Sequence, residues 1–364
     1  MSGFAAGRFH HVSPAIASWL DAAADGLDVG ARAPSELLPV LAEGGLTRVG
    51  VPEVFGGDGG DTNDAIEAIA EVSALSLAAG FVLWGHRTYI EYLLQSPNSA
   101  LREKLLPDLL NGRTAGATGL SNAMKFLAGL EELQIVARPE DGAWVVNGKM
   151  PWVTNLRIEG FHVAAAVAVS DGSPIIASFA SSDDGIARSP DLDLFGLRST
   201  NTAAIGVTNA RLLPGHVLSG DAVRWLPQVR PAFLGLQCGM SIGLARRAIY
   251  EAKSSSGAGR GALSATLGTV STSLNDQKRA LVEGVRDGVF RTAPADLFRI
   301  RIALAEIVAS TVSQATGGRA YVSPSGQGFA RRWREAAFIP IVTPSIVQLR
   351  TVLDAQATRQ TASA

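Results

Sequence analysis

Residues 134–155 read QIVARPEDGAWVVNGKMPWVTN, and this stretch is the most informative part of the chain. Two apolar runs flank Asp141-Gly142, a pair that tolerates the positive φ angles of a tight hairpin turn. We expect a second turn at Asn147-Gly148, after which the chain runs into Trp152 and Thr154. Alternation along a strand places both of these side chains on one face. The segment therefore predicts a hairpin that presents an indole and a hydroxyl together.

An indole beside a hydroxyl suits a flavin, because the indole can cover the flat isoalloxazine ring and the hydroxyl can hydrogen-bond its redox-active edge. The same residues, from Asn147-Gly148 to Trp152-Val153-Thr154-Asn155, resemble the Asn-Gly…Trp-Ile-Thr-Asn signature of the acyl-CoA dehydrogenase superfamily. Further segments resemble motifs of that superfamily in its order, at residues 45–57, 104–112, 196–202, 243–248, 314–321 and 331–336. The resemblance covers roughly residues 40–350.

The resemblance implies an α+β fold with three domains. These are an N-terminal helical domain over residues 1–114, a middle β-barrel or β-sandwich domain over residues 115–222, and a C-terminal four-helix bundle over residues 223–364. The patterning agrees, since Ile66, Ile69 and Val72 recur at helical spacing after Thr62, a suitable N-cap. Short apolar runs separated by turn residues follow at residues 162–169 and 175–180. Longer helical patterns return at residues 230–253, 272–290, 294–315 and 345–355.

Composition excludes several classes of protein. The chain has 364 residues, 47% of them hydrophobic, and a net charge of −1, so it can bury a large core and has no basic stripe for nucleic acid. No apolar run approaches the about 20 residues of a membrane helix, and the N-terminus resembles neither a signal peptide nor a mitochondrial presequence. The single cysteine, Cys238, excludes an internal disulfide, and the five histidines lack helical metal-ligand spacing. We expect a cytoplasmic protein with no metal site and no membrane partner.

The resemblance also assigns cofactor contacts. Residues 118–123 stand where the superfamily has a flavin-binding loop, so the hydroxyls of Thr118 and Ser121 and the backbone of Leu120 are expected to meet the flavin. Arg260 stands in a segment that touches the FAD of a neighbouring subunit in the superfamily, although the Phe-Gly that follows it there is absent here.

A second group of expected contacts lies near the C-terminus. Gln314, Gly317 and Gly318 resemble the turn that receives the ADP half of a neighbour's FAD. The resemblance therefore implies FAD, with FMN as the alternative, and a homodimer or homotetramer. Arg198 and Thr202 are expected to belong to the framework of the β domain, where an arginine usually pairs with an acid.

The catalytic base is the main departure from the superfamily. Acyl-CoA dehydrogenases remove an α-proton with a glutamate, and the resemblance puts that position at Thr343, which cannot act as such a base. No acid occurs between Arg224 and Tyr250, where other members carry the glutamate.

The remaining candidates for a base are less specific. His86, in an apolar run, is first interpreted as a buried imidazole whose hydrogen bonds are satisfied, and second as a proton-handling group near the flavin. Glu53 and Asp221 are two further candidates.

Three functions follow from these patterns. The first is an FAD-binding oxidoreductase that acts on an acyl-CoA or related CH–CH substrate. The second is a reduced-flavin-dependent monooxygenase of the same fold, since such relatives lack the glutamate. The third is a non-catalytic subunit that completes a neighbour's FAD site in a mixed oligomer.

Overall fold

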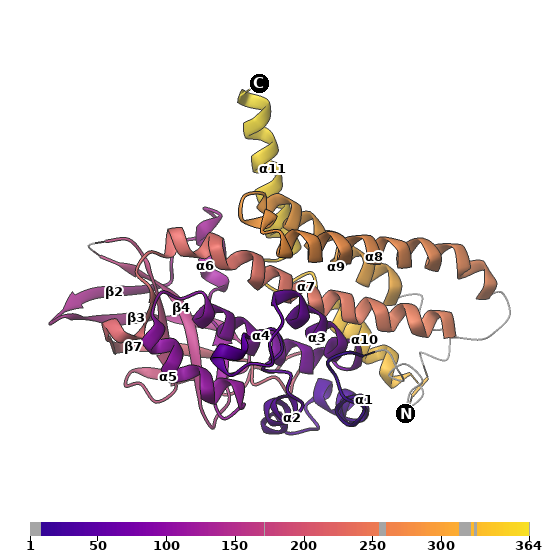
Figure 1. The fold of residues 1–364 in the computed structure, drawn as a ribbon, viewed down its shortest axis with the longest axis horizontal. Coiled ribbons are helices and arrows are strands. Elements are labelled where there is room, and N and C mark those ends of the chain that lie inside the picture. Colours follow the sequence, from indigo (N-terminus) through magenta and orange to yellow (C-terminus); the bar gives the residue numbers. More distant parts are fainter. Residues whose placement is uncertain (1–8, 171, 255–259, 313–321, 324–325, 364) are drawn as a thin grey trace.

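The structure is a computed structural model that describes residues 9–170, 172–254, 260–312, 322–323 and 326–363. Helices come first along the chain, strands follow between Ala115 and Ser219, and helices return from Ala222 onwards (Figure 1). This order agrees with the helical, β and helical sequence expected from the patterning. Within the described residues, none of the helices is both long and apolar enough to cross a membrane.

The N-terminal helices surround one fully buried helix. They are α1 (Pro14–Val29), α2 (Leu37–Glu43), α3 (Thr62–Leu75), α4 (Leu77–Leu94) and α5 (Ser99–Leu110). Every residue of α4 from Leu77 to Leu93 is buried, because this helix packs against α3, α7 and the first strand, and its charged residues Arg87 and Glu91 pair with each other at 3.0 Å. The helix α4 therefore joins the three parts of the molecule.

The start of α3 differs by one residue from the sequence prediction. Asp61, and not Thr62, is the N-cap, and its carboxylate accepts hydrogen bonds from the backbone N–H groups of Asn63 and Asp64. The side chain of Asp64 accepts in turn from the backbone of Asp61, which completes a capping box.

The middle part is a mixed sheet. Its strands are β1 (Ala115–Thr118), β2 (Ile135–Glu140), β3 (Ala143–Val153), β4 (Phe161–Val169), β5 (Ile175–Ala180), β6 (Ile186–Arg188), β7 (Ala203–Leu212) and β8 (Val217–Ser219). They follow the order β6-β7-β3-β2-β4-β5-β8, and β1 pairs with β4. The pairs β1–β4 and β2–β4 are parallel and the others antiparallel. A short helix, α6 (Ser121–Leu127), lies between β1 and β2 in sequence.

The hairpin of β2 and β3 confirms one predicted turn and corrects the other. Asp141 and Gly142 have φ angles of 47° and 72°, as the tight turn requires. The chain does not reverse at Asn147-Gly148, because β3 continues through it with a bulge. Gly148 has φ 150°, and a Cβ there would lie 2.4 Å from the carbonyl oxygen of Gln134 on β2. A glycine is therefore needed for close approach of the two strands and not for a turn.

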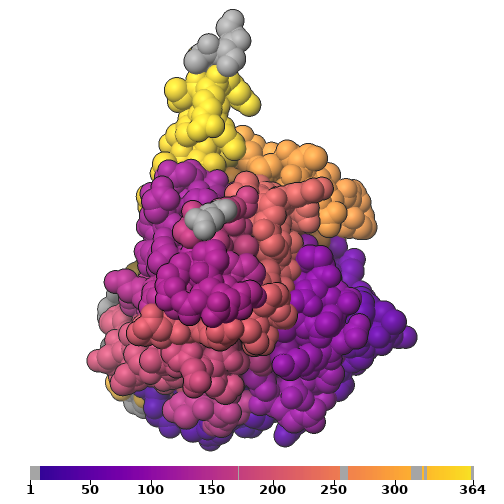
Figure 2. All heavy atoms as spheres, turned by 90° about the vertical axis from the view of Figure 1, so that its left-hand side faces the viewer, coloured from indigo at the N-terminus to yellow at the C-terminus, as the bar shows by residue number. Residues whose placement is uncertain are grey.

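The C-terminal part is helical. It consists of α7 (Ala222–Ser254), α8 (Ser264–Arg286), α9 (Pro294–Val312), α10 (Gln327–Phe338) and α11 (Ile346–Ser363). The helices α7, α8 and α9 pack on one another, and α11 projects away from the body, as Figures 1 and 2 show. The predicted helix over residues 272–290 begins eight residues earlier than expected, at Ser264, and ends at Arg286.

Small residues let α7 lie directly against α3. A Cβ at Gly243 would come within 2.1 Å of the carbonyl oxygen of Ala70, and one at Gly239 within 2.7 Å of that of Ile66. The backbones of the two helices touch at these points, so side chains larger than hydrogen would force them apart. This contact seats the C-terminal helices on the N-terminal ones.

Candidate functional site

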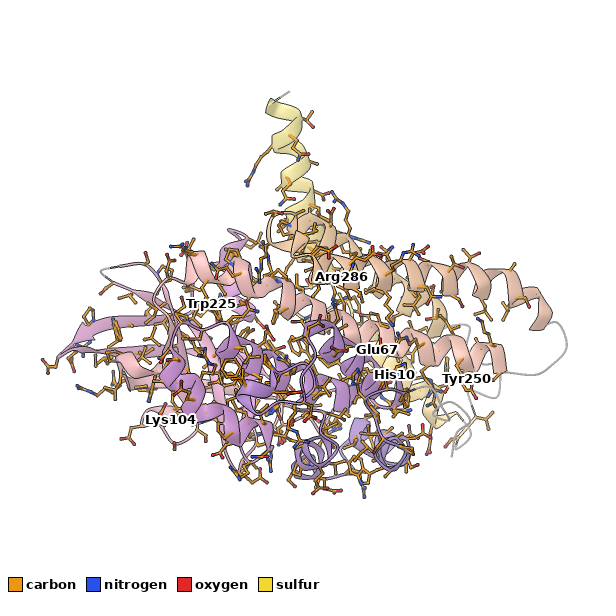
Figure 3. All side chains as sticks on the ribbon, in the orientation of Figure 1. His10, Glu67, Lys104, Trp225, Tyr250 and Arg286 are labelled. Atoms are coloured by element: carbon orange, nitrogen blue, oxygen red, sulfur yellow. The ribbon has the colours of Figure 1, made fainter. Side chains whose placement is uncertain are left out.

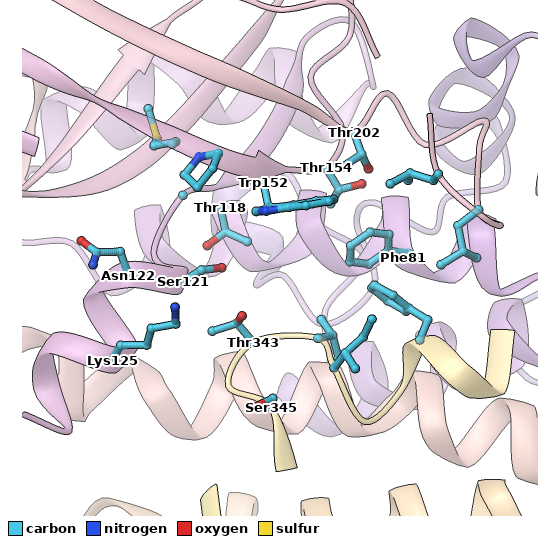
Figure 4. Close-up of a pocket in the computed structure, with 18 of the residues that line it drawn as sticks. Phe81, Thr118, Ser121, Asn122, Lys125, Trp152, Thr154, Thr202, Thr343 and Ser345 are labelled. Carbon is cyan, nitrogen blue, oxygen red and sulfur yellow. The ribbon is translucent and has the colours of Figure 1, made fainter. Parts of the chain in front are cut away.

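A cavity of about 570 Å³ opens between the sheet, α4, α6 and the segment that joins α10 to α11 (Figure 4). Its apolar wall includes Phe81 and Trp84, which lie about one turn apart on α4 and stack with ring centroids 5.5 Å apart. Polar side chains line it from separate segments, and they include Thr118, Ser121, Trp152, Thr154, Thr202 and Thr343. A mainly apolar cavity with a few converging polar groups is typical of a site for a small molecule or cofactor.

Trp152 and Thr154 reach this cavity together from the end of β3. Trp152 is 63% exposed, whereas Thr154 is 4% exposed. The Thr154 hydroxyl donates a hydrogen bond to the Thr200 carbonyl at 3.2 Å, and the hydroxyls of Thr200 and Thr202 lie 2.7 Å apart. The indole is thus free to cover a flat ligand, and the hydroxyl is fixed by the loop that precedes β7.

Thr118 and Ser121 reach the cavity from the end of β1 and the start of α6. The hydroxyl of Thr118 lies 2.9 Å from that of Tyr92, and it accepts a hydrogen bond of 3.4 Å from the backbone N–H of Leu120. Burial raises the pKa of Tyr92, so its phenol stays neutral and can donate to Thr118. Leu120 itself is fully buried and does not line the cavity.

Thr343 lies across the cavity from Trp152 (Figure 4). Its segment is held by a buried chain of hydrogen bonds. Gln237 on α7 donates to the Thr343 carbonyl at 3.0 Å, and Arg301 on α9 donates to the Gln237 side chain at 2.8 Å and to the Ile339 carbonyl at 2.5 Å. Desolvation lowers the pKa of Arg301, which is fully buried. Arg301 and Gln237 could not be predicted as site residues from local sequence patterns, because their partners lie far along the chain.

No free carboxylate lines the cavity within the described residues. Glu131 is the one acid among the residues that line it, and its carboxylate pairs with the Lys125 ammonium at 2.6 Å. The hydrogen bond from Lys125 lowers the pKa of Glu131, so this group stays ionised and paired. Glu53 and Asp221 are exposed and do not line the cavity.

His86 is buried and does not line the cavity either. The backbone N–H of Gly116 donates to its Nδ1 at 3.0 Å, so the proton must sit on Nε2, which donates to the Leu109 carbonyl at 2.9 Å. Desolvation lowers the pKa of His86 to about 4, and the ring stays neutral. These contacts agree with the first interpretation, a satisfied buried imidazole that fixes α4 to β1 and to the end of α5.

The other predicted site residues divide into two groups. Thr202 lines the cavity, whereas Arg198 pairs with Asp193 at the surface, as expected for a framework arginine. Gln314, Gly317 and Gly318 lie outside the described residues, and so does the side chain of Arg260.

A separate cavity of about 1090 Å³ lies at the other end of α7, lined among others by His10, Glu67 and Tyr250 (Figure 3). Burial alone would raise the pKa of Glu67, but Arg246 and Lys278, at 2.5 and 2.9 Å, outweigh it and hold that pKa at about 2. This acid is therefore a paired structural group. Among the described residues, no cluster of His, Cys, Asp or Glu could hold a metal ion.

Comparison with known proteins finds sequence similarity to acyl-CoA dehydrogenases over part of the chain. The model of the acyl-CoA dehydrogenase N-terminal domain matches residues 13–113, which contain α1 to α5. The Mycobacterium leprae protein named "Probable acyl-CoA dehydrogenase fadE25" is 25% identical over 236 residues, which are 62% of this chain and 59% of that protein. The match therefore spans less than two thirds of that relative's length.

Solved structures share the fold over nearly the whole chain. Butyryl-CoA dehydrogenase from Megasphaera elsdenii has a TM-score of 0.77 at 19% identity, covering 94% of this chain and 95% of that one. KijD3, solved in complex with FMN and a dTDP-linked amino sugar, has a TM-score of 0.77 at 20% identity, covering 94% and 91%. Dibenzothiophene monooxygenase from Paenibacillus sp. A11-2 has a TM-score of 0.74 at 18% identity, covering 93% and 94%.

These solved structures share the order of helices, sheet and helices with this chain. At 18–20% sequence identity they show a common fold and no more. Residues 13–113 match the acyl-CoA dehydrogenase N-terminal domain, and the sequence is similar to that of a named acyl-CoA dehydrogenase over 62% of this chain. Beyond residues 13–113, the solved structures show that the chain has the fold of butyryl-CoA dehydrogenase.

Proposed function

We propose that the chain is a flavin-dependent oxidoreductase and that the 570 Å³ cavity receives the isoalloxazine ring. The observation that carries this proposal is the meeting of Thr118, Ser121, Trp152 and Thr154 around one cavity, although they come from separate segments. The volume falls in the range of about 300–1,000 Å³ that is typical of ligand pockets. A bound flavin would supply the reversible uptake of a hydride or of electrons. We propose FAD, with FMN as the alternative.

The residues of the chain would hold such a ring in three ways. Trp152 would cover one face, and the stacked rings of Phe81 and Trp84 would exclude water from the other side of the cavity. The hydroxyl of Thr154 donates its one proton to the Thr200 carbonyl. In this rotamer its oxygen would therefore accept a hydrogen bond from the ligand. Thr118 accepts hydrogen bonds from Tyr92 and from the backbone N–H of Leu120, so it would donate its own proton to the ligand.

The substrate we propose is an acyl-CoA or a related compound oxidised at a CH–CH bond. The similarity to acyl-CoA dehydrogenases and the apolar wall of the cavity support this substrate class. Removal of an α-proton needs a base within hydrogen-bond reach. Thr343 lacks a carboxylate and Glu131 is paired with Lys125, so such a reaction would depend on a base from the substrate, from a partner chain or from Glu131 after its release.

A reduced-flavin-dependent monooxygenase is the second candidate, and a specific observation favours it. The described residues that line the cavity include no free carboxylate, which a monooxygenase of this fold does not require. Exposed apolar side chains also surround the cavity, with Phe195 85% and Ile341 66% exposed. Such a rim would receive an apolar substrate and help to keep water from the ring.

We further propose a cytoplasmic homodimer or homotetramer. The superfamily resemblance of residues 314–318 to a turn that binds a neighbour's cofactor supports the oligomer. Size-exclusion chromatography with light scattering tests it, because a monomer would have a mass of 37.9 kDa. We expect a multiple of that mass, and a monomer at micromolar concentration would contradict the proposal.

An absorbance scan followed by two assays separates the candidates. A yellow protein whose flavin is bleached anaerobically by octanoyl-CoA or another thioester supports dehydrogenation. A colourless protein that consumes oxygen only with added reduced flavin supports the monooxygenase. A colourless, inert chain that co-purifies with a homologue would instead support a non-catalytic subunit and exclude both enzymes.

A further inference from the structure

The segment that joins α10 to α11 forms the wall of the cavity that lies across from Trp152 (Figure 4). This wall segment, residues 339–344, reads IPIVTP. Two of its carbonyl groups, those of Ile339 and Thr343, precede prolines, which have a fixed φ and no N–H group. Both carbonyls accept hydrogen bonds from side chains of α7 and α9. The wall segment is therefore held from behind, on the side away from the cavity.

Arg301 determines how Gln237 is oriented. A guanidinium can only donate hydrogen bonds, so the Oε1 atom of Gln237 must face the Nε of Arg301, at 2.8 Å. The Nε2 group of Gln237 then faces the Thr343 carbonyl and donates to it at 3.0 Å. Arg301 also donates directly to the Ile339 carbonyl at 2.5 Å. One arginine thus fixes both ends of the wall segment.

The charge of Arg301 has no counter-ion among the described residues. The side chain is fully buried, and no carboxylate of those residues pairs with it. Of the described groups, only the Cys238 thiol could offset the charge, and burial raises the pKa of that thiol to about 12, so it stays neutral. The Nη1 group of Arg301 is also buried, and no described residue accepts a hydrogen bond from it. Arg301 is therefore a buried cation whose charge is not neutralised.

A buried cation of this kind acts over several ångströms, because its surroundings screen it far less than water does. Its desolvation costs free energy, and such groups are concentrated at functional sites. Arg301 lies behind the wall segment and does not line the cavity, so it acts on a ligand through that segment and through its electric field. Glu131 is the one acid among the described residues that line the cavity, and Lys125 pairs with it. No free carboxylate of those residues therefore opposes the field of Arg301.

We propose that Arg301 is a positioning residue of the flavin site, which fixes the wall segment through Gln237 and whose charge stabilises the reduced state of the bound ring over the oxidised state. Reduction adds electrons to the ring, so a nearby cation lowers the free energy of the reduced state more than that of the oxidised state. The role of the charge rests on the proposed function, whereas the fixing of the wall segment does not.

The midpoint potential of the bound flavin tests the role of the charge. It is measured by reductive titration of the full chain with dithionite against a reference dye. Arg301→Met should lower the potential by about 30 mV or more, which for two electrons equals a tenfold change in the relative affinities for reduced and oxidised flavin. Gln237→Leu keeps the guanidinium, so its potential should stay within about 10 mV of wild type, a twofold change. A wild-type potential in Arg301→Met, or an equal fall in both variants, would overturn the role of the charge.

Hydrogen exchange of the flavin-free chain, followed by mass spectrometry, tests the fixing of the wall segment. The backbone N–H groups of Ile341, Val342 and Ile346 are hydrogen-bonded in and beside this segment. Gln237→Leu and Arg301→Met each remove hydrogen bonds to its carbonyls, so these amides should exchange about threefold to tenfold faster than in wild type, as expected for the loss of one hydrogen bond. Wild-type exchange rates in both variants would show that the two side chains do not fix the wall segment.

Arg299→Met is the matched control for both experiments. It removes an exposed arginine of the same helix, α9, that pairs with Asp296 and does not line the cavity. Both the potential and the exchange rates should stay as in wild type. If Arg301→Met does not fold by circular dichroism, Arg301→Gln replaces it. This variant also removes the charge, so the same fall in potential is expected, and a wild-type potential would overturn the proposal.

The two experiments separate failure of this inference from failure of the proposed function. A chain that binds no flavin contradicts the proposed function and, with it, the role of the charge, and hydrogen exchange then decides the fixing of the wall segment. A chain that binds flavin with a potential independent of Arg301 contradicts this inference and leaves the proposed function intact.

Discussion

At the scale of single residues, Thr343 separates the two candidate reactions. Replacing it with glutamate would put a carboxylate in the cavity, opposite Trp152. If the chain binds a thioester beside a flavin, Thr343→Glu should accelerate anaerobic bleaching by octanoyl-CoA by about 100-fold, the usual contribution of a general base. The measurement is stopped-flow absorbance at the flavin band. Thr343→Gln is the isosteric, uncharged control, and equal rates in the two variants would count against a dehydrogenase geometry.

His86 predicts a pH dependence of stability. Its pKa is lowered from 6.5 to about 4, so the folded chain resists protonation that the unfolded chain accepts. Above pH 6.5 the His86 imidazole is neutral in both the folded and the unfolded chain, so protonation does not reduce stability. As the pH falls from 6.5 towards 4, only the unfolded chain takes up the proton, and the free energy of unfolding decreases. Over that window His86 should lower the free energy of unfolding by about 3 kcal/mol.

Urea unfolding at several pH values measures this effect. His86→Gln should show a flatter dependence on pH between 6.5 and 4 than wild type, whatever its absolute stability. His10→Gln, which changes an exposed histidine, should keep the wild-type slope. If wild type and His86→Gln have the same slope, the imidazole is not held neutral by burial.

At the scale of elements, the bulge of β3 gives the clearest prediction. Gly148→Ala adds a Cβ that meets the backbone of Gln134 at 2.4 Å, in a region of φ that disfavours side chains. We expect a loss of about 2 kcal/mol in the free energy of unfolding. Gly215→Ala is the control, because a Cβ there meets nothing within 4 Å and its φ is not positive. Equal thermal midpoints for the two variants would show that β2 and β3 are not in this register.

The sequence predicted the elements well where the signal is local. The runs 162–169 and 175–180 are β4 and β5 within one residue, because alternation and turn residues act over a few positions. The Asn-Gly pair at residues 147–148 was predicted less well, because this pair occurs both in turns and in bulges, which need similar φ angles. Here the pairing of β3 with β7 makes it a bulge, and that pairing is not visible in the local sequence.

At the scale of the whole molecule, Asp28 links the three parts of the chain. It is fully buried at the end of α1, accepts a hydrogen bond from the backbone of Leu197 at 2.9 Å, and pairs with Arg334 of α10 at 2.5 Å. Asp28→Asn leaves a positive charge without its partner, so the free energy of unfolding should fall by about 3 kcal/mol. Chemical denaturation measures it.

The matched control for Asp28 lies on the same helix. Asp25 is half exposed, and its buried partner Arg331 keeps a second carboxylate, Glu335, at 3.6 Å, so Asp25→Asn should cost about 1 kcal/mol. Equal losses in both variants would mean that the fully buried Asp28 does not join the parts of the chain more strongly than the half-exposed Asp25 does.

The candidate site could be predicted only in part from the sequence. Trp152, Thr154, Thr118 and Ser121 were identified because they stand in or beside recognisable motifs, and they do line one cavity. Arg301 and Gln237 were missed, because buried polar residues on otherwise ordinary helices have no local sequence pattern. Their partners lie across the fold, as with Asp28 and Arg334, which are separated by 306 residues. Only the three-dimensional packing reveals such contacts.

An equilibrium titration of the purified chain with FAD and FMN tests most directly whether the cavity beside Trp152 holds a flavin ring. Binding is monitored by flavin absorbance and by quenching of tryptophan fluorescence. Trp152→Ala should weaken binding by about tenfold, since stacking of an aromatic ring contributes up to about 1.5 kcal/mol beyond its buried area. Trp333→Ala removes another exposed indole that does not line the cavity, and it should bind flavin like wild type. Wild-type flavin affinity and an unchanged flavin spectrum in Trp152→Ala would contradict a ring held in this cavity.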